Sequence, residues 1–343
     1  MRVIHTDKHR LRDARTELQG GLLTPPFERP ERVERILARL RETGLGPIAP
    51  PEAHGLDPVR RAHDPAYLDF LATAWERWKA AGYPGEVFPT AWPSRRMRRD
   101  QPPDEIDGAV GYYALSGETA IDAGTWEAAQ AAADVAVTAA DMVSDGAPAA
   151  FALCRPPGHH AARDMFGGFC FLNNAAIAAQ RLRDAGAGRV AVLDVDFHHG
   201  NGTQDIFWER PDVLFLSIHG DPAEAYPYYL GGADEIGAGA GEGFTVNLPL
   251  PRDTRYAVWS EAMEACCARI AAYGAEALVV SLGVDAHKDD PIGFFRLESE
   301  DFRRCGRRIG ALGLPSVWVM EGGYALEAIG VNTANALQGF EEA

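Results

Sequence analysis

The sequence has few cysteines, and they show no pattern that would build a disulfide framework or a structural zinc knuckle. They are five in number, an odd count, and no two are spaced as C-x-x-C: Cys154, Cys170, Cys266, Cys267 and Cys305. No apolar run is long enough to span a membrane, and the first residues, MRVIHTDKHRLRD, contain no apolar signal-peptide core. We therefore expect a cytoplasmic protein that binds no membrane, with reduced cysteines that lie mostly in the core.

Positive charge is also scarce. The chain has 33 Lys and Arg against 49 Asp and Glu, a formal net charge of −16 at pH 7. Such a charge repels a phosphate backbone and attracts cations, so it argues against nucleic acid as a partner and favours a small cationic ligand. The apolar share of 46% fits a globular protein with a full core.

Seven apolar runs, rich in β-branched residues, read as buried parallel strands: 1–5, 149–153, 189–195, 213–218, 244–248, 277–284 and 316–320. Helical patterns lie between them, at 30–44 with Pro30 near its start and Gly44 at its end, at 124–146 and at 173–186. This alternation predicts a single α/β domain over 1–343, with a doubly wound, mostly parallel sheet and helices on both faces.

One segment departs from this regular pattern. Residues 82–108 are rich in proline and arginine, and a connection of this length in a compact domain is usually functional or disordered. Its basic run, RRMRR at 95–99, reads as a solvated or salt-bridged surface, since the chain as a whole is acidic.

The stretch LDVDFHHGNGTQ, 193–204, places charge directly after a buried strand. Alternate side chains of an extended chain share a face, so Asp194, Asp196 and His198 would line one side of the strand's exit. Two carboxylates with an imidazole suggest a divalent metal, although a single aspartate here is more often a cap or turn residue.

Polar side chains follow the other strands too. In open α/β sheets ligands bind beyond the carboxyl ends of the strands, so these residues are expected at one edge of the sheet. They are His159, His160, Asp194, Asp196, His198, Asp285 and Tyr324. Such convergence has few structural explanations, and it predicts a metal site.

At these residues the sequence resembles the histone deacetylase superfamily, which has the arginase–deacetylase fold. The motifs RPPGHH, GGFCFLNNAA, DVDFHHGNGTQ, SLGVDAHKDDP and EGGY occur in the family's order. The stretches TELQGGLLTPPFE, GYYALSGETAIDAGTWEAA and SIHGDPAEAYP, with the long loop, resemble the bacterial acetylpolyamine amidohydrolases within it. The resemblance covers nearly the whole chain.

The resemblance implies one catalytic Zn²⁺ per chain, held by Asp196, His198 and Asp285. Three protein ligands leave open positions on the metal, as a hydrolytic metal requires. It also implies that Tyr324 donates to the developing oxyanion, that His160 is the general base and later the acid, and that His159 acts mainly through its charge.

A structural K⁺ is implied as well. Its ligands would be Asp194, which also hydrogen-bonds His159, and Ser217, with main-chain oxygens at Asp196, His198 and Ile218. Asn201 stands where histone-acting relatives have an aspartate behind the general base. An amide can orient that imidazole but adds no negative charge, so His160 should be less basic here.

The substrate implied by the resemblance is a small cationic acetylated amine. Its channel would be lined by Phe169 and Tyr226. At position 226 relatives often have Phe, and Gln19 stands where a Tyr is expected. The implied acidic residues at the mouth are Glu17, Asp107 and Glu118, although Glu118 lies near a helix start, where a carboxylate also favours the helix dipole. Related amidohydrolases dimerise through the long loop, which implies a homodimer.

Three other functions remain open at this point. A deacetylase of acetyl-lysine in proteins or peptides would share the chemistry and differ in access to the cleft. A binuclear enzyme of the arginase type needs ligands for a second metal, which Asp194 does not obviously supply. A binding module without activity is disfavoured, because ligands, base and tyrosine are all present.

Overall fold

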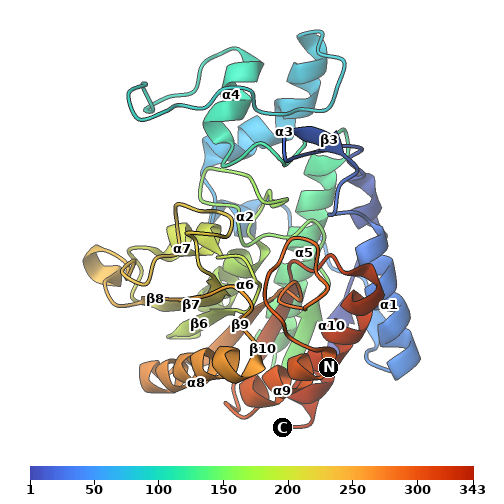
Figure 1. The fold of residues 1–343 in the computed structure, drawn as a ribbon, viewed down its shortest axis with the longest axis vertical. Helices are drawn as coiled ribbons and strands as arrows, with labels where there is room; N and C mark the ends of the chain where they lie inside the picture. The colour runs from blue at the N-terminus through green and yellow to red at the C-terminus, as the bar shows by residue number, and fades with distance from the viewer.

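An eight-stranded parallel sheet forms the centre of the computed structural model, which describes residues 1–343 (Figure 1). The strand order is β4-β1-β5-β10-β9-β6-β7-β8, and every neighbouring pair is parallel. The strands are β1 (Arg2–Ile4), β4 (Ile48–Ala49), β5 (Ala149–Ala152), β6 (Val190–Asp194), β7 (Val213–Gly220), β8 (Thr245–Leu250), β9 (Ala277–Leu282) and β10 (Ser316–Met320). The apolar runs predicted seven of them; β4 is too short to give a pattern.

Helices cover both faces of this sheet, which confirms the predicted fold class. Along β6, Val190 and Val192 face one core cluster, whereas Ala191 and Leu193 face the other. The first cluster contains α5 (Thr125–Ser144), α6 (Asn174–Asp184) and α7 (Asn201–Phe207). The second contains α1 (Glu31–Thr43), α8 (Tyr256–Tyr273), α9 (Ser299–Gly310) and α10 (Leu326–Glu341).

Local signals set the ends of these helices. Gly44 ends α1 in the left-handed region, at φ 71°, and its N–H bonds the carbonyls of Leu40 and Arg41. Asn173 begins α6, because its side chain accepts a hydrogen bond from the N–H of Ala176. The three helices expected from sequence correspond to α1, α5 and α6.

A smaller helical layer lies beyond the sheet's carboxyl edge. It consists of α2 (Asp57–Arg60), α3 (Pro65–Ala80) and α4 (Ile106–Tyr113), and these helices share a third core cluster with parts of α5 and α6. Nearby lie the 3₁₀ helix η1 (Asp7–Leu11) and the antiparallel hairpin of β2 (Glu17–Gln19) and β3 (Leu22–Thr24); a second 3₁₀ turn, η2, spans Gly239–Gly241. The sequence reading did not predict the hairpin.

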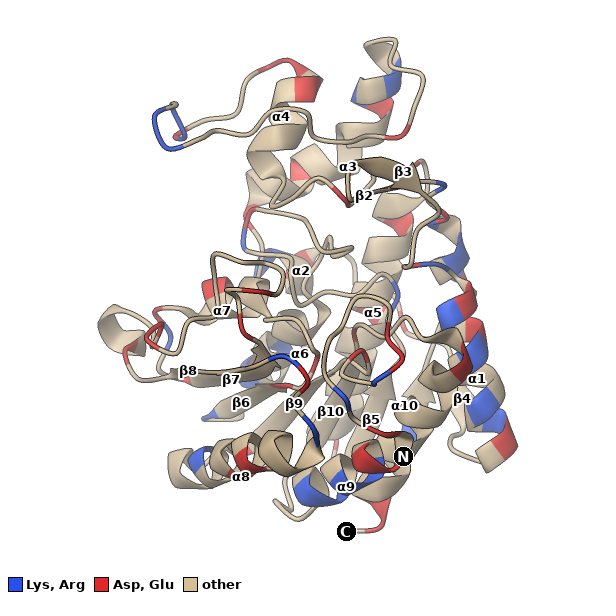
Figure 2. Ribbon diagram, viewed as in Figure 1, with Lys and Arg blue, Asp and Glu red and all other residues tan.

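The long loop leaves this layer and projects from the body, as Figure 1 shows beside α4. Residues 82–105 contain no helix or ladder strand, and α4 begins at Ile106, so the last residues of the expected loop, about 82–108, are helical. The basic run forms the blue tip of this loop in Figure 2, where Arg98 pairs with Asp100. All five cysteines are buried and unpaired, and no helix combines the length and apolar character of a membrane span.

Candidate active site

The predicted site residues come from four strands that are neighbours in the sheet, in the order β5-β10-β9-β6. His159 and His160 follow β5, Asp194 is the last residue of β6, and Asp196 and His198 follow β6. Asp285 follows β9, and Tyr324 follows β10. Because the strands are parallel, their carboxyl ends meet at one edge, and the site forms there.

Asp196, His198 and Asp285 form a compact cluster of possible metal ligands. Nδ1 of His198 lies 3.2 Å from Oδ1 of Asp196 and 3.1 Å from Oδ2 of Asp285. Both carboxylates are fully buried, and His198 is 7% exposed. One imidazole proton cannot serve two carboxylates, so the cluster favours a cation between its three side chains.

The electrostatics of the cluster show the same preference. Burial raises the pKa of Asp285 to about 7, and the nearby charge of Asp196 adds to this rise. Burial lowers the pKa of His198, but its hydrogen bonds with the two carboxylates outweigh burial and raise that pKa to about 10. The donor set thus attracts positive charge strongly enough to hold a proton on His198.

The main chain orients these ligands. The N–H of Gly322 donates to Oδ2 of Asp196 at 2.8 Å, and the N–H of Phe197 donates to Oδ1 of Asp285 at 2.8 Å. A Cβ at Gly322 would lie 2.4 Å from Oδ2 of Asp285, so glycine is required where the backbone approaches both carboxylates. The first glycine of EGGY therefore serves the ligand cluster.

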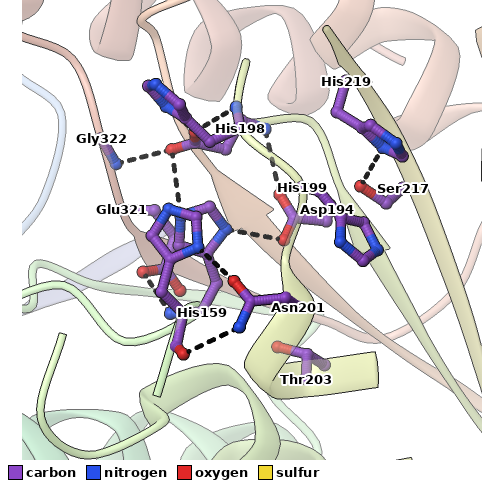
Figure 3. Close-up of polar contacts among 12 residues, drawn as sticks. His159, Asp194, His198, His199, Asn201, Thr203, Ser217, His219, Glu321 and Gly322 are labelled. Carbon is purple, nitrogen blue, oxygen red and sulfur yellow. Dashed lines mark hydrogen bonds and ion pairs between the residues drawn. The ribbon is translucent and has the colours of Figure 1, made fainter. Parts of the chain in front are cut away.

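The two adjacent histidines have different partners, and Figure 3 shows His159 and its neighbours. Nδ1 of His159 lies 2.9 Å from Oδ2 of Asp194, and Nδ1 of His160 lies 2.7 Å from Oδ1 of Asn201. Burial lowers the pKa of His159, but Asp196 and Asp194 raise it to about 10. Burial and the charges of His159 and His198 lower the pKa of His160 well below 6.5. His159 is therefore cationic and His160 neutral at pH 7.

Sequence reasoning missed Glu321, although it quoted the EGGY motif. This buried carboxylate accepts hydrogen bonds through Oε2 from the N–H of Gly158 at 2.6 Å and from the N–H of His159 at 3.1 Å. It thus ties the segment before His160 to the end of β10. Burial raises the pKa of Glu321 to about 7, and its other oxygen has no partner in the chain.

Tyr324 is held from two sides, and its hydroxyl is left without a protein partner. Its N–H donates to Oδ2 of Asp290 at 2.7 Å, and the guanidinium of Arg32 lies 4.7 Å from its ring centroid. Arg32 also donates to the carbonyl oxygens of Gly323, at 2.7 Å, and Glu321, at 2.5 Å. Burial raises the pKa of Tyr324 well above 10, so the hydroxyl stays protonated and can donate.

Arg32 belongs to a buried arginine cluster that the sequence did not reveal. Glu28 lies at its centre and pairs with Arg12 at 2.8 Å, Arg32 at 3.1 Å and Arg155 at 2.7 Å. Burial raises the pKa of Glu28, but the three guanidinium groups outweigh it and lower that pKa to about 2. Main-chain carbonyls accept further hydrogen bonds from the arginines.

A cavity of about 410 Å³ leads away from the ligand cluster. Its lining includes the predicted substrate residues Glu17, Glu118, Phe169 and Tyr226, together with Gln19, His160, His198 and Tyr324. Asp107 is not among the lining residues, because it lies on α4, where it accepts hydrogen bonds from Thr90 at 2.8 and 3.1 Å. A larger groove of about 990 Å³, beside Trp75 and Glu86, contains none of the predicted site residues.

Glu118 is fixed in the cavity wall by polar neighbours. Its Oε1 accepts hydrogen bonds from Ser116 at 2.6 Å and from the N–H of Gly168 at 2.9 Å. The hydroxyls of Ser116 and Tyr226 lie 2.7 Å apart, so Tyr226 reaches Glu118 through Ser116. Sequence reasoning did not single out Ser116, since nothing near a lone serine in a loop marks it as a partner.

Phe169 and Tyr226 form aromatic walls near the reacting groups. The ring of Tyr226 meets that of His160 edge-on at 5.1 Å, and the ring of Phe169 lies 5.7 Å from that of Tyr324. A Cβ on the preceding residue, Gly168, would lie 2.2 Å from the His160 ring. A side chain there would displace His160.

The residues assigned to potassium lie on two paired strands. Asp194 and Ser217 are opposite one another in the register of β6 and β7, and Ile218 follows directly. Oδ1 of Asp194 accepts a hydrogen bond from the N–H of Asp196 at 3.1 Å, and the hydroxyl of Ser217 lies 2.8 Å from Nδ1 of His219. Potassium binding itself stays a prediction.

The histone deacetylase domain model matches residues 26–340, which include the ligand cluster, both histidines and Tyr324. The chain belongs to the histone deacetylase family.

Close relatives narrow this class. The chain is similar to the acetylpolyamine amidohydrolase of Mycoplana ramosa, with 58% identity over 99% of both chains. It is similar to acetylpolyamine amidohydrolase 1 of Pseudomonas aeruginosa, with 55% identity over 100% of this chain and 99% of the relative. The crystal structure of an acetylpolyamine aminohydrolase from Burkholderia pseudomallei matches with a TM-score of 0.94 and 41% identity, over 99% of this chain and 98% of that one.

Proposed function

We propose that this protein is a zinc-dependent amidohydrolase that removes acetyl groups from acetylated polyamines. The observation that carries the proposal is one cavity whose lining combines His198 of the ligand cluster, His160 and Tyr324 with the acidic residues Glu17 and Glu118. The relatives named above support the substrate class.

The donor set of Asp196, His198 and Asp285 fits Zn²⁺, because carboxylate and imidazole are its usual ligands and three protein ligands are typical of catalytic sites. A bound zinc ion would polarise the amide carbonyl and make water a stronger acid. His159 lies beside Asp196, with Nε2 of His159 3.8 Å from its Oδ2, and adds positive charge at this end of the cavity.

His160 moves the proton in this mechanism. When neutral, its Nδ1–H donates to Asn201, which leaves the lone pair on Nε2. His160 then accepts a proton from the attacking water and later donates it to the nitrogen of the leaving amine. Asn201 thus acts as a positioning residue that selects the tautomer.

Tyr324 supplies the donor for the oxyanion. Its hydroxyl is protonated, because burial raises its pKa, and no protein group competes for its proton. The hydrogen bond strengthens as charge develops on the carbonyl oxygen, so it lowers the barrier more than it tightens substrate binding.

The walls of the cavity favour a cationic chain. Oε1 of Glu118 is occupied by three hydrogen bonds, whereas Oε2 accepts none from the chain and can pair with an ammonium. Glu17 is 4% exposed, and burial raises its pKa to about 7. A nearby ammonium would restore its ionised form.

Turnover of acetylputrescine, acetylcadaverine, acetylspermidine and an acetyl-lysine peptide, by protein of measured zinc content, tests the proposal. We expect kcat/KM to be highest for the acetylpolyamines. Preference for the peptide would favour the protein deacetylase alternative, a second metal ion bound beside the first at the ligand cluster would favour the arginase type, and no turnover by zinc-loaded protein would favour a binding module.

We propose further that the chain is one domain that forms a homodimer and holds a structural potassium ion. Large apolar side chains are exposed on the hairpin and the long loop, with Leu22 at 68%, Leu23 at 65% and Met97 at 61%, which favours a partner on this side. Light scattering of a chain lacking about residues 85–99 should show a monomer. An unchanged mass would refute pairing through this loop.

A further inference from the structure

We infer a second metal site, formed by His5, Asp7 and His9 where β1 ends and η1 begins. One ligand atom of each side chain lies within 4.8 Å of the others. Nε2 of His5 is 3.8 Å from Oδ1 of Asp7, and the two imidazole rings have centroids 5.2 Å apart. Two imidazoles and a carboxylate are a donor set for Zn²⁺.

The two histidines have no other partners. All four ring nitrogens are buried, and none makes a hydrogen bond within the chain. His9 as a whole is only 1% exposed. A buried polar atom without a partner is destabilising, so four such atoms at one place indicate a ligand. The side chain of Asp7 is 82% exposed and its one ion pair is with His5, so it can turn toward the same ion.

Charges around the site determine which ion it suits. Nearby Arg10 pairs with Glu34 at 3.2 Å, and Arg155 pairs with Glu28, so acidic partners offset part of the positive charge. One carboxylate among nitrogens excludes Mg²⁺ and Ca²⁺, which need several oxygen ligands, and favours Zn²⁺.

This site is separate from the catalytic cavity, which none of its residues lines. The carbonyl oxygen of His9 accepts a hydrogen bond from Arg155, and Lys8 of η1 pairs with Glu127 of α5 at 3.0 Å. An ion here would fasten η1 to the end of β1 beside the arginine cluster. We therefore expect it to stabilise the fold and to leave turnover nearly unchanged.

Zinc titration of the holoenzyme, with its catalytic site already loaded, tests this inference. We expect one further Zn²⁺ per chain with a Kd of about 1 μM, on the order of −8 kcal/mol, and a rise in Tm as zinc is added. Two variants should weaken only this second event. His5→Phe should abolish it, and Asp7→Asn should weaken it at least about tenfold.

His54→Gln is the matched control, because His54 is a half-buried histidine elsewhere that bonds Thr138. It should keep both zinc ions. Because Asp7 is exposed, Asp7→Asn decides the question even if His5→Phe does not fold. A single zinc per chain in the wild type, or wild-type affinity in Asp7→Asn, would overturn the inference and would mean that water alone solvates the two histidines.

Discussion

Two buried charge clusters lie on either side of Tyr324, and their excess charges have opposite signs. At the ligand cluster, two carboxylates converge on the single nitrogen of His198. At the arginine cluster, three guanidinium groups converge on the single carboxylate of Glu28. Main-chain carbonyls accept several of the remaining N–H groups in the second cluster, whereas no protein cation other than the neighbouring imidazoles balances the first. A site for an external cation is thus marked by excess negative charge that the chain does not neutralise.

The largest expected effect comes from removing the anion of the arginine cluster. Glu28→Gln leaves three buried arginines without their anion and should lower the free energy of unfolding by about 3–5 kcal/mol. The matched control is Glu31→Gln, whose exposed pair with Arg35 should contribute less than about 1 kcal/mol. Urea unfolding measures both.

The pH dependence of this effect has a defined sign. The pKa of Glu28 is lowered to about 2 in the folded protein, below its ordinary value of 4.5. Its contribution is therefore fully present above pH 4.5 and is lost as pH falls toward 2. The difference between wild type and Glu28→Gln should shrink over that window, and a constant difference would contradict an ionised Glu28.

The next effect concerns the reacting groups between the clusters. His160→Ala and Tyr324→Phe should each lower kcat by about 10²-fold or more, through loss of the proton carrier or of the oxyanion donor. Steady-state rates at equal zinc content measure this. Near-normal kcat in either variant would remove that residue from the mechanism.

A smaller effect is expected at Glu118, a carboxylate of the cavity wall that has no cationic partner, and it tests whether such carboxylates also select the substrate. Glu118→Gln should lower kcat/KM for a cationic acetylpolyamine by about one to two decades, or about 1–3 kcal/mol, and spare a neutral acetamide of similar length. Glu224 also lines the cavity, but it pairs with Arg252 at 2.9 Å, so Glu224→Gln is the matched control. Equal losses for both substrates would make Glu118 structural.

The smallest expected effect comes from adding a negative charge next to His160, the proposed general base. In the proposed mechanism neutral His160 is the active form, and burial with the nearby imidazoles lowers its pKa well below 6.5, so activity should fall only at pH well below 6.5. In Asn201→Asp a carboxylate replaces the amide and should raise this pKa by about one unit or more, which is about 1.4 kcal/mol per unit. The acidic limb of kcat/KM against pH should therefore move to higher pH; an unmoved limb would contradict contact between residue 201 and the base.

The sequence predicted the sheet, three helices and the groups that meet at its edge, because strand periodicity and the polar residues after each strand are local patterns. It could not predict the partners of those groups. Glu28 and Arg32 lie near the start of an ordinary helix, and the contact of Arg32 with the 321–324 segment depends on how distant chain segments pack. Ser116 and Glu321 likewise gain their roles only when β5, β10 and the loop before α5 come together.

The hydrogen bonds of Arg32 with Glu321 and Gly323 join residues 289 and 291 positions apart, so they bear on how the protein is made. Asp196 and His198 leave the ribosome long before Asp285 and Tyr324 are synthesised. A nascent chain that ends before β9 has neither the third ligand nor the oxyanion donor, and contacts so distant in sequence form slowly. If the proposed function holds, metal binding and activity are therefore late events in biosynthesis, which follow the synthesis of β9 and β10.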